Sequence, residues 1–308
     1  MKQAEISVVG EIYIDHVMSG FDTWPAPGTE VVTENYTRDI GGGAAITACG
    51  LARLGRAVNL IGVVGVGDAV WLQLRLHEFG VSPQGLRKVT GPTGVTLSVS
   101  TREDRSFFTH VGANRRLAEQ LLDHDVLASM VRARHVHFAM PLAHELAAQI
   151  LPALSAAGCT TSLDVGHQPA WLQDEANWDT CRAVDYLLPN EKEAALLSGG
   201  ESPESYFAFA RRLRMRSAIL KLGARGAMGH ADAVLTVTPP AVAAIDSTGS
   251  GDAFDAGFID ALLDSATMEE CLRRACVCGA LSTRMPGALD GLPTREELRS
   301  TCERTYGS

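Results

Sequence analysis

The sequence predicts an α/β protein built around a mostly parallel sheet that helices cover on both faces. Short β-type runs alternate with helical patterns over most of the 308 residues, and this alternation is typical of parallel sheets. The predicted strands are almost continuously apolar, as expected for strands that are buried on both faces. A chain of this length can bury a large core, and we expect a single domain over residues 1–308.

Hydrophobic periodicity places the individual elements. Residues 6–9 read Ile-Ser-Val-Val and residues 58–64 read Val-Asn-Leu-Ile-Gly-Val-Val, and such runs of β-branched side chains favour strands. The same pattern predicts further strands at 135–138, 160–163, 186–188 and 218–222. Apolar residues at helical spacing predict helices at 44–54, 71–79, 142–156, 191–197 and 205–213.

Two segments interrupt this alternation. Residues 12–39 contain a Trp-Pro-Ala-Pro-Gly stretch followed by a β-rich run, and residues 92–111 alternate like a hairpin. We expect both excursions to leave the main sheet and to pair into a small antiparallel β lid. Spacing alone equally allows two independent surface hairpins.

The composition indicates a soluble enzyme that acts on a small molecule. Hydrophobic residues make up 46% of the chain and charged residues 20%, which excludes a disordered chain or a coiled coil. The net charge of −9 argues against nucleic-acid or membrane partners. No run approaches the roughly 18 apolar residues of a membrane span. Seven cysteines without a Cys-x-x-Cys pair indicate reduced thiols in a cytoplasmic protein.

The strongest chemical signal is the string Gly249-Ser250-Gly251-Asp252, where small residues end abruptly at a helical pattern. A glycine turn at a helix start leaves unpaired N–H groups, and the helix dipole favours an anion there. We expect Asp252, at the same terminus, to be ionised at neutral pH. This pairing suits phosphoryl transfer, because the turn stabilises the moving phosphoryl group while the carboxylate accepts a hydroxyl proton. The alternative is an ordinary helix start with an acidic cap and no role in catalysis.

A second motif is the triple glycine Gly41-Gly42-Gly43, which leads into a helix of small residues. Glycines would let a sugar ring lie against the main chain, and the small helix face permits close packing. The two motifs together resemble the paired signatures of the PfkB carbohydrate kinase family, whose members are ribokinase-like. Five further segments resemble that family in the same order: 10–16, 27–30, 112–114, 188–193 and 221–227.

This resemblance implies a three-layer α/β/α fold with a small β lid and gives roles to individual residues. Asp252 would be the catalytic base, with Gly249, Ser250 and Gly251 as the anion hole. The residues expected to contact the substrate are Asp15, Gly41, Gly42, Gly43 and Asn114. The lid would close over the sugar and exclude water, and in many members it also forms a homodimer interface.

The same resemblance implies ATP and Mg²⁺ as cofactors. Asn190 and Glu193 would organise Mg²⁺ and the phosphates through water, since Mg²⁺ retains much of its hydration shell. Lys221 and Gly223 would lie near the nucleotide. The segment containing Asp246 and Thr248 resembles the monovalent-cation loop of ribokinase-like members, so activation by K⁺ is a hypothesis.

Several departures from the family pattern limit the prediction of the substrate. Ile46 stands where the family usually has Asn, and Tyr13 stands near the position of an Asn of ribokinases. A Glu that contacts the substrate in ribokinases is missing from 137–140, and the family's Asp-x-Asn-x-Arg stretch reads Asp-Val-Gly-His-Gln at 164–168. Because such sites discriminate through hydroxyl contacts, we expect a less polar pocket than that of a ribokinase.

We therefore predict ATP-dependent phosphorylation of a hydroxymethyl group on a small sugar or sugar-like molecule. A modified sugar, a sugar acid and a nucleoside all remain open as substrates. A nucleoside kinase of the same family and a non-catalytic sugar- or nucleotide-binding regulator are the alternatives. A dinucleotide-binding fold is disfavoured because Val70 replaces the third glycine of the required motif. The pair His135 and His137 could bind zinc, but packed strand histidines are more common.

Overall fold

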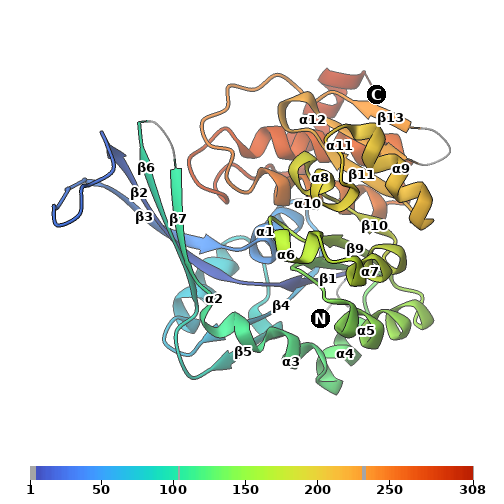
Figure 1. Ribbon diagram of the computed structural model, residues 1–308, viewed down its shortest axis with the longest axis horizontal. Helices are drawn as coiled ribbons and strands as arrows, with labels where there is room; N and C mark the ends of the chain where they lie inside the picture. Colours follow the sequence, from blue (N-terminus) through green and yellow to red (C-terminus); the bar gives the residue numbers. More distant parts are fainter. Residues whose placement is uncertain (1–4, 103–104, 231–233, 308) are drawn as a thin grey trace.

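The computed structural model describes residues 5–102, 105–230 and 234–307. Within them the chain forms a nine-stranded sheet flanked by helices and a separate four-stranded sheet that stands out from it (Figure 1). The order of the large sheet is β13-β12-β11-β10-β9-β8-β1-β4-β5. The predicted three-layer α/β fold is thus confirmed.

Seven neighbouring strands of the large sheet run parallel. They are β5 (Leu86–Val89), β4 (Val58–Gly65), β1 (Ile6–Gly10), β8 (His135–Ala139), β9 (Thr160–Asp164), β10 (Tyr186–Leu187) and β11 (Ala218–Lys221). The six strands predicted from the sequence all lie among these seven. At the other end of the sheet β12 (Ala227–His230) pairs antiparallel with β11, and the edge strand β13 (Val234–Val237) pairs antiparallel with β12. The five residues between β11 and β12 are too few for a parallel crossover.

Helices cover both faces of this sheet. On one face α1 (Gly43–Arg53) packs on α10 (Ser250–Leu263), which packs on α11 (Met268–Ser282). The opposite face buries side chains of α5 (His144–Ala156) and α9 (Pro203–Leu213) against β9 and β11. The remaining helices are α2 (Ala69–Glu78), α3 (Leu117–Leu121), α4 (His124–Met130), α6 (Pro169–Leu172), α7 (Trp178–Ala183), α8 (Glu191–Ser198) and α12 (Arg295–Tyr306), with short 3₁₀ turns at η1 (Pro83–Gly85), η2 (Gly112–Arg116), η3 (Glu175–Asn177) and η4 (Gly223–Arg225). All five predicted helices are present, with ends that differ by one or two residues.

The two excursions form one four-stranded sheet, which we call the lid sheet. It consists of β2 (Tyr13–Phe21), β3 (Asn35–Gly41), β6 (Gly94–Thr101) and β7 (Arg105–His110), in the order β3-β2-β6-β7. The outer pairs are antiparallel as predicted, but the central pair β2–β6 is parallel. Strands β1 and β5 run in the same direction, so the chain leaves the main sheet at the same edge both times. The two outgoing strands therefore lie parallel.

This topology brings distant residues to one edge of the main sheet. Gly10, Ala139, Asp164 and Lys221 are the last residues of β1, β8, β9 and β11, and ligands of open α/β sheets bind at such carboxyl ends. The lid sheet rises beside the same edge (Figure 1).

Two further features concern the helices and the cysteines. Across the described ranges no helix combines the length and apolar character of a membrane span. All seven cysteines are buried and unpaired with one another.

Candidate active site

The turn predicted to bind an anion lies at the start of α10. Gly249 caps the helix in the left-handed conformation, with φ 73°, which glycine adopts without steric cost. The Ser250 N–H donates to the Ser247 carbonyl at 3.2 Å. In the described part of the chain, the N–H groups of Gly249 and Gly251 have no protein acceptor. Two of the three predicted amides are therefore available to an anion at the positive end of the helix dipole.

Asp252 lies in the first turn of α10, beside these amides. Burial and the neighbouring Asp164 raise the pKa of Asp252 to about 7. The helix start was expected to keep this carboxyl ionised, but desolvation outweighs that effect. Near neutral pH the side chain thus exists in both protonation states, which suits a group that accepts and releases a proton.

Lys221 connects Asp252's helix to the sheet. Its ammonium nitrogen lies 2.6 Å from Asp164 Oδ2 and 2.7 Å from Asp255 Oδ1, and 3.4 Å from the Gly251 carbonyl oxygen. Burial alone would lower the pKa of Lys221, but the two carboxyls hold it well above its ordinary value. Its ion pair holds the pKa of Asp164 at about 2 despite burial. The Lys221 ammonium is thus held among carboxyls, and the expected place of Lys221 near the nucleotide stays a prediction.

Asp164 and Asp255 were absent from the predicted site. Together with Asp252 they bring three carboxyl groups within 4.8 Å of one another, and the Lys221 ammonium supplies the cation for this cluster. Burial raises the pKa of Asp255 well above its ordinary value. The sequence carried one signal for Asp255, because its spacing of three from Asp252 places both on one helix face.

The triple glycine lies next to two carboxyl groups, those of Asp252 and Asp15. A Cβ on Gly43 would lie 2.6 Å from Asp252 Oδ1, and one on Gly41 would overlap the Asp15 carboxylate. Gly42 has φ 92°, and the α-hydrogen that stands in place of a side chain faces the Glu11 carbonyl oxygen. Glycine at 41 and 43 therefore makes room for two carboxylates.

Asp15 and Asn114 lie at the base of the lid sheet. Burial and the neighbouring Asp39 raise the pKa of Asp15 to about 6, while a hydrogen bond from Thr96 lowers it. The Asn114 amide accepts from Ile12 N at 3.1 Å and donates to Ile12 O at 3.0 Å. Asn114 thus fastens the main chain that leads into β2, and a direct contact with substrate stays a prediction.

The structure shows what surrounds Tyr13 and Ile46, two residues that depart from the family pattern. The Tyr13 hydroxyl donates to Glu11 Oε2 at 2.8 Å. Ile46 is buried beside the predicted anion-binding turn, where a Cβ on Gly249 would lie 3.2 Å from Ile46 Cγ2. The histidines considered as zinc ligands both hydrogen-bond Ser162 Oγ, through His135 Nε2 at 2.7 Å and His137 Nδ1 at 2.8 Å. This arrangement gives no support to a zinc site.

A cavity of about 730 Å³ opens next to Asp252. Its walls come from the ends of β9 and β11, the start of α10, the segment 239–244 and one face of α11. The predicted residues in its lining are Asn190, Glu193, Lys221, Gly223, Gly249, Ser250, Gly251 and Asp252. Its size falls in the range of small-molecule pockets. Asp15 and the triple glycine are not in this lining. Gly43 lies against Asp252, and Gly41 lies against Asp15 at the base of the lid sheet.

Asn190 and Glu193 form a capping box at the start of α8. The Asn190 side chain accepts from Glu193 N, and the Glu193 carboxylate accepts from Asn190 N at 2.8 Å. Glu193 is only 4% exposed, and burial together with Asp164 raises its pKa to about 7. This oxygen-rich pair on the cavity wall fits Mg²⁺ held through water, the coordination that this ion prefers.

The predicted cation loop is ordered by Asp246. Its carboxylate accepts from Thr248 N at 3.0 Å, from Thr248 Oγ1 at 2.7 Å and from Gly287 N at 3.0 Å. The carboxylate thus joins the segment before α10 to the segment after α11, and bound K⁺ stays a prediction.

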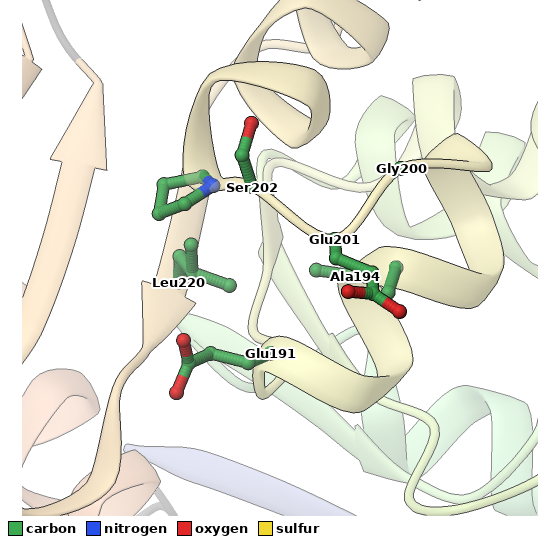
Figure 2. Close-up of a pocket in the computed structure, with 8 residues that line it drawn as sticks. Glu191, Ala194, Gly200, Glu201, Ser202 and Leu220 are labelled. Carbon is green, nitrogen blue, oxygen red and sulfur yellow. The ribbon is translucent and has the colours of Figure 1, made fainter.

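A second, smaller hollow lies away from this chemistry. Figure 2 shows it between Glu191 at the start of α8, Ser202 before α9 and Leu220 on β11. The space inside it that could hold even a water molecule is about 0 Å³, so it offers no room for a ligand.

Comparisons of sequence and structure relate the chain to carbohydrate kinases. The family model described as pfkB family carbohydrate kinase matches residues 3–295. An ATP-dependent ribose-1-phosphate kinase of Halopiger xanaduensis is 32% identical over 271 residues, covering 87% of this chain and 88% of that protein. A 2-dehydro-3-deoxygluconokinase of Bacillus subtilis is 27% identical over 282 residues, covering 86% and 87%. The structure of Arabidopsis thaliana ribokinase with ribose and ATP has a TM-score of 0.87 at 24% identity, covering 97% and 99%.

The chain thus has the ribokinase fold, with Asp252 in the first turn of α10. It belongs to the pfkB family of carbohydrate kinases.

Proposed function

We propose that this protein transfers the γ-phosphoryl group of ATP to a hydroxymethyl group of a small sugar or sugar-like molecule. The observation that carries the proposal is the position of Asp252. It lies between the 730 Å³ cavity and the glycines under the lid sheet, beside two unpaired amides at a helix start.

In the reaction the substrate oxygen attacks the γ-phosphorus in line. The new oxygen–phosphorus bond forms, the bond from phosphorus to the bridging oxygen of ADP breaks, and the hydroxyl proton moves to Asp252. A pKa of about 7 lets Asp252 accept that proton and return it to solvent. The Gly249 and Gly251 amides stabilise charge on the phosphoryl oxygens. The lid sheet would exclude water from the reacting groups.

Asn190 and Glu193 would hold Mg²⁺ through water on the cavity wall. When bound, Mg²⁺ neutralises charge on the phosphates. Glu193→Gln removes one negative charge but retains an acceptor for the Asn190 N–H. We expect this variant to need more Mg²⁺ for half-maximal rate, with the fold intact by circular dichroism. An unchanged Mg²⁺ requirement would contradict this role.

Asp15 and Gly41 would contact the substrate, and the raised pKa of Asp15 reflects its sheltered position. A screen of ATP consumption over neutral sugars, sugar acids and nucleosides tests the proposal and separates a sugar kinase from a nucleoside kinase. Release of ADP with one class of acceptor supports it. Tight sugar or nucleotide binding without turnover on any of them would instead point to a regulator.

Two further features of the proposal can be measured separately. We propose K⁺ activation through the loop of Asp246 and Thr248, which a rate that is equal in K⁺ and Na⁺ would exclude. We also propose a cytoplasmic homodimer through the lid sheet. Phe108 on β7 and Trp24 in the segment between β2 and β3 are 54% and 48% exposed and stack at 5.9 Å. Light scattering of the intact protein would give the oligomeric state.

A further inference from the structure

A buried cluster joins three elements beneath Asp252. Lys221 ends β11, Asp164 ends β9, and Asp255 lies in α10. The Asp255 side chain is fully buried, and the side chains of Lys221 and Asp164 are 10% and 14% exposed. Groups of this kind are costly to bury unless their partners are well placed. Here the Lys221 ammonium has three oxygen partners, at 2.6, 2.7 and 3.4 Å.

Two of these oxygens belong to the start of α10, on either side of Asp252. Gly251 precedes the base and offers its carbonyl oxygen, and Asp255 follows it by almost one helical turn. A single ammonium group therefore holds the helix just before and just after the base. The third oxygen, on Asp164, fastens that group to the main sheet.

The charges balance if Asp255 is a neutral acid. Lys221 and Asp164 then form one ion pair. Apart from the contact of Oδ1 with Lys221, the two Asp255 carboxyl oxygens are buried without a hydrogen-bond partner among the described residues. The Asp255 carboxyl lies within 4.8 Å of the Asp164 carboxyl, so a proton on Asp255 can be shared with Asp164. On its other side Asp255 Oδ2 faces His137 Nε2 at 3.9 Å. That nitrogen is buried without a hydrogen-bond partner, and burial keeps His137 neutral by lowering its pKa to about 3. The imidazole therefore supplies no second cation to balance an ionised Asp255.

We propose that Lys221, Asp164 and Asp255 form a positioning cluster for catalysis, in which Asp255 acts as a neutral hydrogen-bonding acid. The cluster fixes the first turn of α10, and with it Asp252 and the anion-binding amides, relative to the edge of the sheet. The inference rests on the proposed kinase function, since it names what holds the proposed base in place. A displacement of about 1 Å at such a site can lower the rate about 100-fold.

A pair of substitutions at Asp255 tests its role. Asn retains an oxygen to accept from Lys221 and gains N–H groups that can donate to Asp164, so Asp255→Asn should keep kcat within about threefold of the wild type. Asp255→Leu has similar volume without polar atoms. We expect it to lower kcat at least tenfold, with the affinity for a non-hydrolysable ATP analogue unchanged. Equal losses in both variants would show that the charge of Asp255 is needed and would overturn the neutral-acid assignment.

Variants at Lys221 test the connection to the sheet. Lys221→Met leaves Asp164 buried and unpaired, which is strongly destabilising. The double variant Lys221→Met/Asp164→Asn removes both charges and remains informative if the single variant does not fold. We expect kcat of the double variant to stay at least tenfold low while it is folded by circular dichroism. Recovery of wild-type kcat would overturn the positioning role.

Amide hydrogen exchange separates this inference from the proposed function. Exchange at residues 250–256 can be measured without any substrate, so it does not depend on catalysis. We expect at least tenfold faster exchange in Asp255→Leu than in Asp255→Asn. If the wild type phosphorylates no acceptor but this difference appears, the kinase proposal fails and the cluster stands. If turnover is present but neither exchange nor kcat responds, only the cluster role fails.

Discussion

The Asp252 carboxylate lies directly against the main chain of Gly43, where a Cβ would be 2.6 Å from Oδ1. The two residues come from the starts of α10 and α1, which are far apart in the sequence. A hydrogen bond of 3.3 Å from Thr47 Oγ1 to the Asp252 carbonyl holds the same two helices together. The glycine motif and the acidic motif are thus two halves of one site.

This contact predicts the effect of Gly43→Ala. Gly43 does not have a positive φ, so alanine fits the backbone but its methyl group must displace Asp252. We expect kcat to fall about 10- to 100-fold, with little change in melting temperature. Gly67→Ala is the matched control, since Gly67 also lacks a positive φ and has open space around its Cβ. A Gly43→Ala variant as active as Gly67→Ala would argue against a fixed Asp252.

The role of Asp252 as base predicts a different pattern for Asp252→Asn. The amide has the same shape but cannot accept the proton, so we expect kcat to fall about 10²- to 10⁴-fold. Affinity for an ATP analogue, measured by calorimetry, should change less than threefold. Asp290→Asn serves as the control because its side chain is 58% exposed. Near wild-type turnover in Asp252→Asn would rule out this base.

The raised pKa of Asp252 predicts the pH dependence of the rate. The base works only when deprotonated, and its pKa is about 7, so kcat should fall about tenfold per pH unit below 7 and level off above. Asp164 and Glu193 raise this pKa, and Lys221 lowers it. Glu193→Gln should therefore move the midpoint to lower pH.

Rates between pH 5.5 and 9, with the fold monitored by circular dichroism, check this dependence. A flat profile down to pH 5.5 would mean that no buried carboxyl acts as the base. A midpoint that Glu193→Gln leaves in place would mean that Glu193 does not act on Asp252.

Much of the fold could be predicted because its signals are local. Apolar β-branched runs marked β1 and β4, and helical spacing marked α5 and α9. Strand β12 reads Ala-Met-Gly-His, which has little strand propensity, and it went unpredicted because its partner β11 determines its structure. The parallel pairing of β2 with β6 follows from the direction of β1 and β5, which no local pattern contains.

The candidate site likewise has a part that local sequence patterns predict and a part that only the folded chain brings together. Asp252 and the glycines stand in short motifs that local reasoning can find. The cluster of Asp164, Lys221 and Asp255 joins the ends of two strands to a helix, so it exists only once the sheet order is known. The Asn-x-x-Glu spacing of Asn190 and Glu193 also fits a helix capping box, and the structure contains that cap.

We expect Asp260, which lies away from the site, to contribute strongly to the free energy of unfolding. Its side chain is fully buried and lies 2.6 Å from Arg56, 2.7 Å from Arg295 and 3.1 Å from Arg274. Asp260→Ala leaves these guanidinium groups without their shared buried partner, and we expect it to lower the free energy of unfolding by about 3–5 kcal/mol. Glu296→Ala breaks an exposed pair with Arg299 and should cost far less, because solvent screens exposed ion pairs. Urea unfolding measures both; similar losses in the two variants would show that burial of Asp260 adds nothing.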